Sequence, residues 1–226
     1  MADAALPSRF DLSTPAGRRR AEADLLWADH GFLRLAFHNF HWIGPGMARA
    51  NQPSPKQIAR YAAEGFRTII NLRGRSDTGY YALEREACAA HGLALIDAPL
   101  GSREAPSKAR VHRAKEIFEA IEYPALMHCK SGADRAGIMA VFYKHFHLGR
   151  PIGEAMDQLD GKYLHVKAGK TGMLDFFFET YLRETAASGK PFLQWVDEDY
   201  EPERVMASFH VQWWGTLLTE GILRRE

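Results

Sequence analysis

Short apolar runs alternate with segments of helical spacing along the middle of the chain. The runs Thr68–Leu72, Leu93–Ile96 and Ala125–Met127 are typical of buried strands. Helices are predicted between them, over Tyr80–His91 and from Ser107 onward, where apolar residues recur at helical spacing. This alternation predicts an α/β fold in three layers, with helices flanking a central, mostly parallel sheet and ligands bound at the carboxyl ends of the strands.

Local signals set the start of several other elements. The stretch Phe37–Ala50 has Gly-Pro-Gly at its centre, which predicts two short strands joined by a turn. The segment Ser54–Gln57 predicts a capping box and a helix through Glu64. Ser13 or Thr14, followed by Pro15, predicts an earlier helix.

These elements predict three segments in the chain of 226 residues. Residues 1–35 are expected to form an N-terminal helical extension, and residues 36–187 the main α/β domain. A polar break over Ser188–Pro191 precedes a tryptophan-rich segment, so residues 188–226 are expected to form a C-terminal helical extension packed on the domain. An amphipathic helix that meets a membrane surface or a partner is the alternative, because exposed tryptophans need an interface.

Composition narrows the class of protein. The net charge of +1 argues against a nucleic-acid binder, and no apolar run reaches the length of a transmembrane helix. Only Cys88 and Cys129 are present, too few for a disulfide framework, and no secretory signal pattern is evident, so a cytoplasmic location is expected. The histidine pairs lack a convincing third ligand, so no metal and no cofactor is expected.

The segment from His128 to Gly137 carries the most informative chemistry, because it lies between a predicted strand and a predicted helix. A tight loop that opens a helix can surround an anion with backbone N–H groups and with the positive end of the helix dipole. The same groups stabilise a cysteine thiolate. Arg135, five residues after Cys129, can fold back and hold two phosphate oxygens in a fork. The candidate phosphate-binding residues are Lys130, Ser131, Gly132, Ala133, Asp134 and Arg135, with Cys129 as nucleophile.

The sequence His-Cys-Lys-Ser-Gly-Ala-Asp-Arg resembles the HC-x5-R signature of the cysteine-dependent protein tyrosine phosphatase superfamily, in particular its compact dual-specificity branch of bacterial type. The similarity runs from about Asn39 to Tyr181 and includes the segments Arg49–Pro53 and Asn71–Arg73. The resemblance implies a phosphatase that works through a cysteinyl-phosphate intermediate. Rival interpretations are a rhodanese-like sulfur transferase, an inactive phosphate-binding module and a buried, inert cysteine.

Three carboxylates compete for the role of general acid. Asp134 lies inside the cradle, as in the Asp-Arg pair of myotubularin-type and Sac-type phosphoinositide phosphatases, and is favoured over Asp97 and then Glu104. The separation of Asp97 from Cys129 along the chain resembles that of the mobile-loop acid from the cysteine in dual-specificity enzymes. Glu104 lies in a loop. Each is alternatively a structural or solvated carboxylate. Ala136 departs from the Ser or Thr that many family members place after the arginine, which predicts slow turnover unless Ser131 substitutes.

Three basic residues indicate which kind of substrate the loop binds. Lys130, Arg73 and Arg75 are predicted to form a positive rim for a second phosphate or an acidic head group, with ordinary solvated charges as the alternative. The expected partner is therefore a phosphorylated protein or a small phosphorylated compound or lipid head group, and a phosphoinositide or inositol-phosphate phosphatase is the alternative function. A reversible disulfide between Cys88 and Cys129 is a further hypothesis.

Overall fold

The computed structural model describes residues 9–34 and 37–211 of the chain. It divides into two compact units, of which the first comprises Met1–Leu100 and Ala120–Ala136 and the second Gly101–Glu119 and Gly137–Glu226. The predicted division of the chain near residues 35 and 188 stays a prediction.

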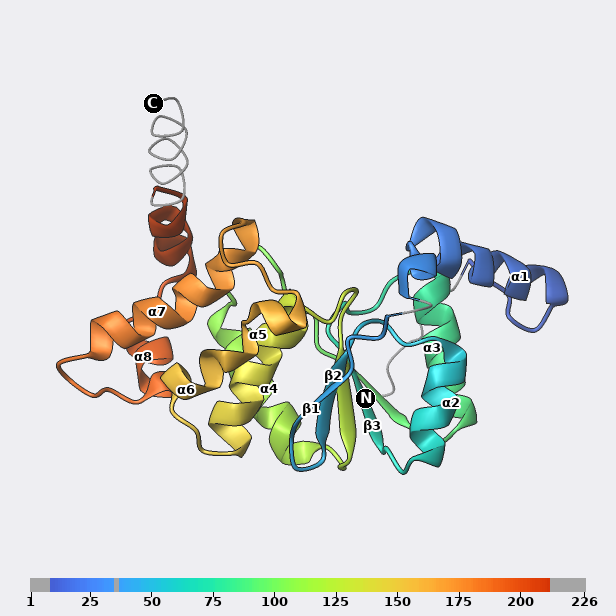
Figure 1. The fold of residues 1–226 in the computed structure, drawn as a ribbon, viewed down its shortest axis with the longest axis horizontal. Helices are drawn as coiled ribbons and strands as arrows, with labels where there is room; N and C mark the ends of the chain where they lie inside the picture. The colour runs from blue at the N-terminus through green and yellow to red at the C-terminus, as the bar shows by residue number, and fades with distance from the viewer. Residues whose placement is uncertain (1–8, 35–36, 212–226) are drawn as a thin grey trace. The chain divides into compact units, whose positions relative to one another are not determined.

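A five-stranded sheet forms the centre of the first unit, with strand order β1-β2-β5-β3-β4 (Figure 1). The hairpin strands β1 and β2 pair antiparallel, and every other pair is parallel. The α/β fold with a mostly parallel central sheet is confirmed. The strands are β1 (His41–Gly44), β2 (Met47–Ala50), β3 (Thr68–Asn71), β4 (Ala94–Asp97) and β5 (Ala125–His128).

The register of the parallel strands places four residues in one row at their carboxyl ends. Ala50 pairs with His128, His128 with Asn71, and Asn71 with Asp97. Cys129 comes directly after this row. The sheet therefore brings the predicted nucleophile to the edge where parallel sheets bind ligands.

The helices of the first unit begin where the sequence predicts. The Thr14 side chain accepts a hydrogen bond from the Gly17 N–H, and Ser54 and Gln57 form the predicted capping box. Figure 1 shows α2 and α3 side by side along the sheet. The elements are α1 (Pro15–Ala23), the π-helical turn η1 (Asp24–Ala28), the 3-10 turn η2 (Gly31–Arg34), α2 (Pro55–Ala63) and α3 (Gly79–Ala90).

Apolar side chains from the sheet and from these helices form the core of the first unit. Ile58 of α2, Ile69 of β3 and Leu126 of β5 are each 0% exposed and belong to one cluster with Cys88. Because these positions follow helical spacing on α2 and fill consecutive positions in the buried strands, the sequence pattern already marks them as interior.

The second unit is helical. Trp195 is fully buried, its ring lies 5.9 Å from that of Phe177, and its Nε1 donates to Glu184. Trp213 and Trp214 lie outside the described residues. The helix predicted after the loop forms as an α-helix followed by a π-helical turn. The elements are α4 (Lys108–Ala120), α5 (Asp134–Phe142, which begins at the end of the first unit), η3 (Tyr143–His147), α6 (Ile152–Ala155), η4 (Met156–Gln158), η5 (Gly161–Tyr163), η6 (Lys170–Gly172), α7 (Met173–Thr185) and α8 (Phe192–Glu198).

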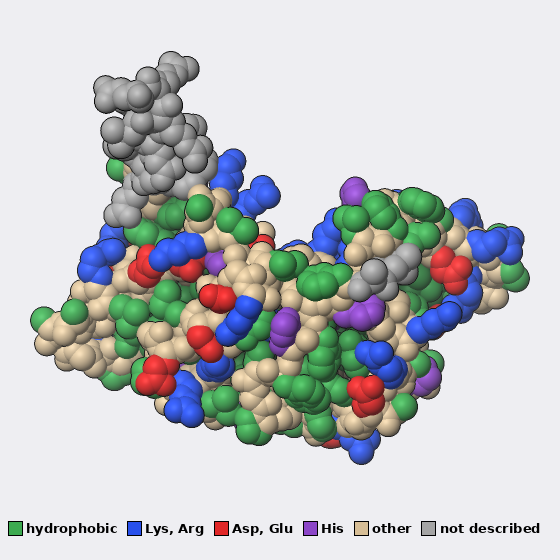
Figure 2. All heavy atoms as spheres, in the orientation of Figure 1, with side chains coloured by type: hydrophobic (Ala, Val, Ile, Leu, Met, Phe, Trp, Pro, Cys, Tyr) green, Lys and Arg blue, Asp and Glu red, His purple; other side chains and the backbone are tan. Residues whose placement is uncertain are grey.

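Charges of both signs are interspersed on the face drawn in Figure 2, with hydrophobic side chains between them. Among the described residues, no helix combines the length and the apolar character needed to cross a membrane.

Candidate active site

The predicted phosphate-binding loop connects the end of β5 to the first turn of α5, entirely within the first unit. Cys129 is 2% exposed and follows the last residue of the strand. The backbone N–H of Gly132 donates to Cys129 Sγ at 3.2 Å. The loop thus folds back on its own cysteine, and a backbone dipole stabilises negative charge on the sulfur.

Three residues outside the loop, Asn39, Arg49 and Gln52, form a frame that donates hydrogen bonds to the carbonyl groups of the loop. The Lys130 carbonyl accepts from the Gln52 N–H at 3.4 Å, and the Ser131 carbonyl accepts from Asn39 Nδ2 at 3.0 Å. Arg49 Nη2 donates to the carbonyls of Gly132 and Ala133 at 2.8 and 2.7 Å.

Four successive carbonyls are therefore bound to the surrounding frame. In a trans peptide the C=O of one residue and the N–H of the next point in opposite directions. The N–H groups of residues 131–134 are consequently directed away from the frame, which is the arrangement that an anion-binding loop requires.

Gly132 is needed in the loop for two reasons. Its φ is +75°, in the left-handed region that favours glycine. A Cβ at this position would lie 2.7 Å from the Ala50 carbonyl carbon and 2.7 Å from the Asn51 nitrogen, both backbone atoms. The loop thus packs directly on the end of β2, where no side chain fits.

The remaining loop residues take positions consistent with ligand binding. Arg135 lies in the first turn of α5 and has no hydrogen-bond or ion-pair partner among residues 9–34 and 37–211. Asp134 begins α5 and is half-buried. Ser131 is exposed, and its Oγ accepts from the Ala133 N–H at 3.4 Å. Ala136 is fully buried.

A buried carboxylate lies against the histidine that precedes the nucleophile. Glu84 of α3 and His128 are both 0% exposed, and Glu84 Oε1 is 2.6 Å from His128 Nε2. The two side chains are not aligned for an ordinary hydrogen bond. The contact connects α3 to the strand residue on which Cys129 depends for its position.

Asp97 is held as a structural brace. Its carboxylate accepts from Tyr81 Oη at 2.7 Å, from Asn71 Nδ2 at 2.9 Å and from Arg75 Nε at 3.1 Å. Its backbone is also two strands away from His128, a separation of roughly 10 Å at ordinary strand spacing. Burial, and to a smaller extent the hydrogen bond to Asp97, raises the pKa of the Tyr81 hydroxyl. This geometry supports the bracing role that the sequence left open for Asp97.

Arg75, one member of the predicted positive rim, therefore pairs with Asp97. The other two meet at Asp29, a residue that the sequence did not single out. Arg73 donates to both Asp29 oxygens at 2.5 and 2.8 Å, and Lys130 Nζ is 3.5 Å from Asp29 Oδ1. The Arg73 guanidinium also lies 3.4 Å from the centre of the Tyr80 ring.

Glu104 belongs to the second unit, where it pairs with Arg110 at 2.5 Å. Both cysteines are buried free thiols. Burial, with Glu84 and Asp97 nearby, raises the pKa of the Cys88 thiol to about 12. No group of three or more metal-ligating side chains occurs in the described part of the chain.

Sequence reasoning missed the residues that shape the loop from outside. Arg49 and Asn39 bind loop carbonyls, and Glu84 supports His128. One signal was available for Arg49, since an arginine within the apolar strand Met47–Ala50 must find buried acceptors. Nothing local marked Asn39, Glu84 or Asp29.

Comparisons with known proteins agree with this geometry. Residues 46–172, more than half of the chain, match the family model described as PTP-NADK, a DSP-PTPase phosphatase fused to NAD+ kinase. No curated protein matches the chain.

Solved structures with a similar fold include P. aeruginosa TpbA, with 18% identity and a TM-score of 0.50 over 70% of this chain and 88% of that one. A variant of TpbA in complex with pTyr has 19% identity and a TM-score of 0.51 over 67% and 91%. Tk-PTP in its active form has 20% identity and a TM-score of 0.49 over 62% and 97%. Likeness at such identity concerns the fold.

Proposed function

This chain belongs to the family of DSP-PTPase phosphatases described as fused to NAD+ kinase, and from this premise we propose that it hydrolyses phosphate monoesters through a cysteinyl-phosphate intermediate. Membership in the family makes it a phosphoric monoester hydrolase of the protein tyrosine phosphatase type. The observation that carries the mechanism is the loop itself, with four carbonyls bound outward beside a buried Cys129.

The chemistry assigned to each loop residue is as follows. The Cys129 thiolate attacks phosphorus in line with the leaving oxygen, and the S–P bond forms as the P–O bond breaks. Arg135 and the loop amides hold the equatorial oxygens, where charge develops in the transition state. Water then attacks the cysteinyl phosphate, which releases inorganic phosphate and restores the thiolate.

Asp134 is the acid that we assign to protonation of the leaving oxygen. It is half-buried and lies beside Arg135 in the first turn of α5, close to the reacting centre along the chain. Asp97, by contrast, accepts three hydrogen bonds, from Tyr81 of α3, from Asn71 of β3 and from Arg75 between these two elements. The same Asp134 carboxylate would act as the base for water in the second step.

Replacement of each carboxylate by its amide separates the two candidates. Asp134→Asn is expected to lower kcat by about 10²-fold or more, the usual contribution of a general acid. Asp97→Asn keeps an acceptor for Tyr81 and is expected to lower thermal stability with a much smaller loss of kcat. The opposite pattern would assign the acid to Asp97.

Two substrate classes remain within this proposal. A phosphorylated tyrosine, serine or threonine on a protein is the first, by analogy with the dual-specificity type. An inositol phosphate or phosphoinositide is the second, favoured by the cations Lys130 and Arg73 gathered at Asp29 beside the loop. We also propose a reducing, cytoplasmic location, because both cysteines are free thiols and Cys129 must stay reduced to act.

Hydrolysis of para-nitrophenyl phosphate, with reductant and without added metal, tests the function directly. The native chain is expected to release para-nitrophenolate, and Cys129→Ser is expected to abolish this activity. Circular dichroism is expected to show that the Cys129→Ser chain keeps its folded structure. Activity that survives in Cys129→Ser would contradict the cysteine mechanism. A well-folded native chain without activity, which still binds inorganic phosphate, would favour an inactive phosphate-binding module.

A further inference from the structure

A cavity next to the candidate active site belongs to the first unit and is lined partly by the N-terminal segment. We propose that this cavity binds a second anionic group of the substrate, so that the substrate is a phosphate monoester carrying another phosphate or a carboxylate. This inference rests on the proposed function and names the substrate class of the same site.

The cavity has a volume of about 140 Å³. A single water occupies about 30 Å³ in the liquid, so the cavity can hold a group larger than one water molecule. Its wall contacts the outer side of the loop, because Gln52 lines the cavity and donates its backbone N–H to the Lys130 carbonyl at 3.4 Å. The lining residues that carry the argument are Arg34, His38, Gln52, Gln57, Leu25 and Leu26.

Gln52 supplies a buried hydrogen-bond donor without an acceptor. Its side chain is almost fully buried, and its Oε1 accepts from Arg73 Nη1 at 2.9 Å. Its Nε2, however, has no hydrogen-bond partner among the residues that the structure describes. Buried donors in native proteins are almost always satisfied, by a protein group, by ordered water or by a ligand, and we assign a ligand oxygen to this donor.

The charges beside the cavity point to an anion. Among residues 9–34 and 37–211, Asp29 is the one carboxylate that contacts Arg34, at 2.6 Å, Arg73 and Lys130. Burial would raise the pKa of Asp29, but its hydrogen bond from Arg73 and the charges of Arg73, Arg34 and Lys130 lower it. Three cations therefore share one negative charge.

Arg34 is the cation that lines the cavity itself. Its side chain is only 10% exposed, and burial lowers the pKa of its guanidinium in spite of the contact with Asp29. An arginine in this condition is stabilised by a second negative partner. A phosphate or carboxylate in the cavity supplies that partner.

Apolar side chains form another part of the lining. Leu25 and Leu26 come from the π-helical turn η1, and Pro53 follows Gln52. An anionic group held by Arg34 and Gln52 would thus be attached to a carbon skeleton that contacts these residues. A ring bearing two phosphates has this chemistry, either as a soluble inositol bisphosphate or as the head group of a phosphoinositide.

The test compares phosphate release from an inositol monophosphate and from inositol bisphosphates. Arg34→Gln is expected to lower the ratio of kcat/KM for bisphosphate over monophosphate by about 10-fold or more, as loss of a charge-assisted hydrogen bond does. Gln52→Glu, which keeps the acceptor for Arg73 but replaces the free donor by a carboxylate, is expected to lower the ratio further. It also serves as the second variant if Arg34→Gln does not fold.

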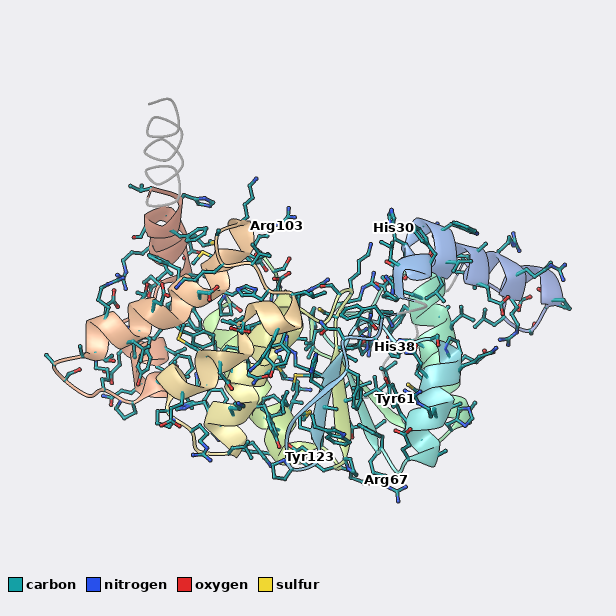
Figure 3. All side chains as sticks on the ribbon, in the orientation of Figure 1. His30, His38, Tyr61, Arg67, Arg103 and Tyr123 are labelled. Atoms are coloured by element: carbon teal, nitrogen blue, oxygen red, sulfur yellow. The ribbon has the colours of Figure 1, made fainter. Side chains whose placement is uncertain are left out.

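Arg67→Gln is the matched control, because it removes the same charge from an exposed residue directly before β3. Figure 3 shows Arg67 near Tyr123 at one end of the first unit and His38 nearer the other end. This variant is expected to keep the native ratio. A parallel assay uses vesicles of phosphatidylcholine that contain a phosphatidylinositol phosphate. Phosphate release from the vesicles would identify a lipid head group as the substrate, and phosphate release from soluble bisphosphates would identify a free inositol phosphate.

An unchanged ratio in both Arg34→Gln and Gln52→Glu would overturn the inference and leave the proposed function intact, provided that Cys129-dependent hydrolysis persists. If no phosphate ester is hydrolysed, the proposed function fails, and titration calorimetry with inositol bisphosphate decides the inference alone. Binding to Cys129→Ser that weakens about 10-fold when Arg34→Gln is added supports the subsite. Absent or equal binding overturns it.

Discussion

The structure makes the shape of the phosphate-binding loop depend on Arg49, which belongs to a different strand. Arg49 is 0% exposed, and its Nη2 donates to the carbonyls of both Gly132 and Ala133. Arg49→Met keeps an unbranched side chain in the same buried volume but removes the donor. Both carbonyls then lose their partner in a site closed to water.

The expected magnitudes follow from these contacts. An unsatisfied buried acceptor costs about 1–3 kcal/mol, hence roughly 2–6 kcal/mol for two. Removal of a buried guanidinium, with its desolvation cost, offsets several kcal/mol of that loss. A net loss of about 2 kcal/mol corresponds to a fall in Tm of about 4–8 °C for a chain of this size.

Activity is expected to fall much further than stability. When the two carbonyls rotate toward other hydrogen-bond donors, the N–H groups of the same peptide planes rotate away from the phosphate position. Loss of one such preorganised donor costs about 10²–10³-fold in kcat, so kcat/KM is expected to fall at least about 10²-fold.

Thermal melting and para-nitrophenyl phosphate kinetics measure the two effects on the same samples. Arg67→Met, at an exposed position of the same unit, is the control and is expected to match the native chain in both. If Arg49→Met lowers Tm but retains native kcat/KM, the loop keeps its shape without Arg49 and the reasoning is refuted.

Other features of the first unit lead to predictions of the same kind. Gly132→Ala is expected to reduce kcat/KM by at least about 10-fold, because a left-handed φ costs about 1–2 kcal/mol for alanine and the Cβ would overlap the backbone of β2; native kinetics would contradict this. Asp29→Asn is expected to lower Tm at neutral pH. Since the folded-state pKa of Asp29 lies below its ordinary value of 3.8, the stability that its carboxylate contributes is present above about pH 4 and is lost as pH falls through the folded-state pKa. The Tm difference from the native chain should therefore shrink below pH 4, and a constant difference down to pH 2 would argue against the linkage. Cys88 is expected to escape alkylation by iodoacetamide at pH 8 until the chain is unfolded in urea, because it is 1% exposed and its pKa is raised to about 12; mass spectrometry reads the result. Labelling of folded Cys88 would revive the hypothesis of a reversible disulfide with Cys129.

The sequence by itself determined the features that depend on neighbouring residues. The capping box of Ser54 and Gln57, the strand that begins at Ala125 and the helix after the loop all follow from local patterns, since caps and periodicity act within one or two turns. The candidate nucleophile and arginine were found in the same way, because the loop that holds them is continuous in the chain.

The tertiary structure decided what surrounds that loop. Arg49 meets Gly132 across 83 positions in the chain, and Arg73 meets Asp29 across 44. The three hydrogen bonds to the Asp97 carboxylate come from side chains on β3, on α3 and in the segment between them. Such contacts depend on strand order and on how helices pack, which a local pattern does not specify. The cavity beside Gln52 arises for the same reason, since η1, η2 and the segment after β2 form its walls only when the chain is folded.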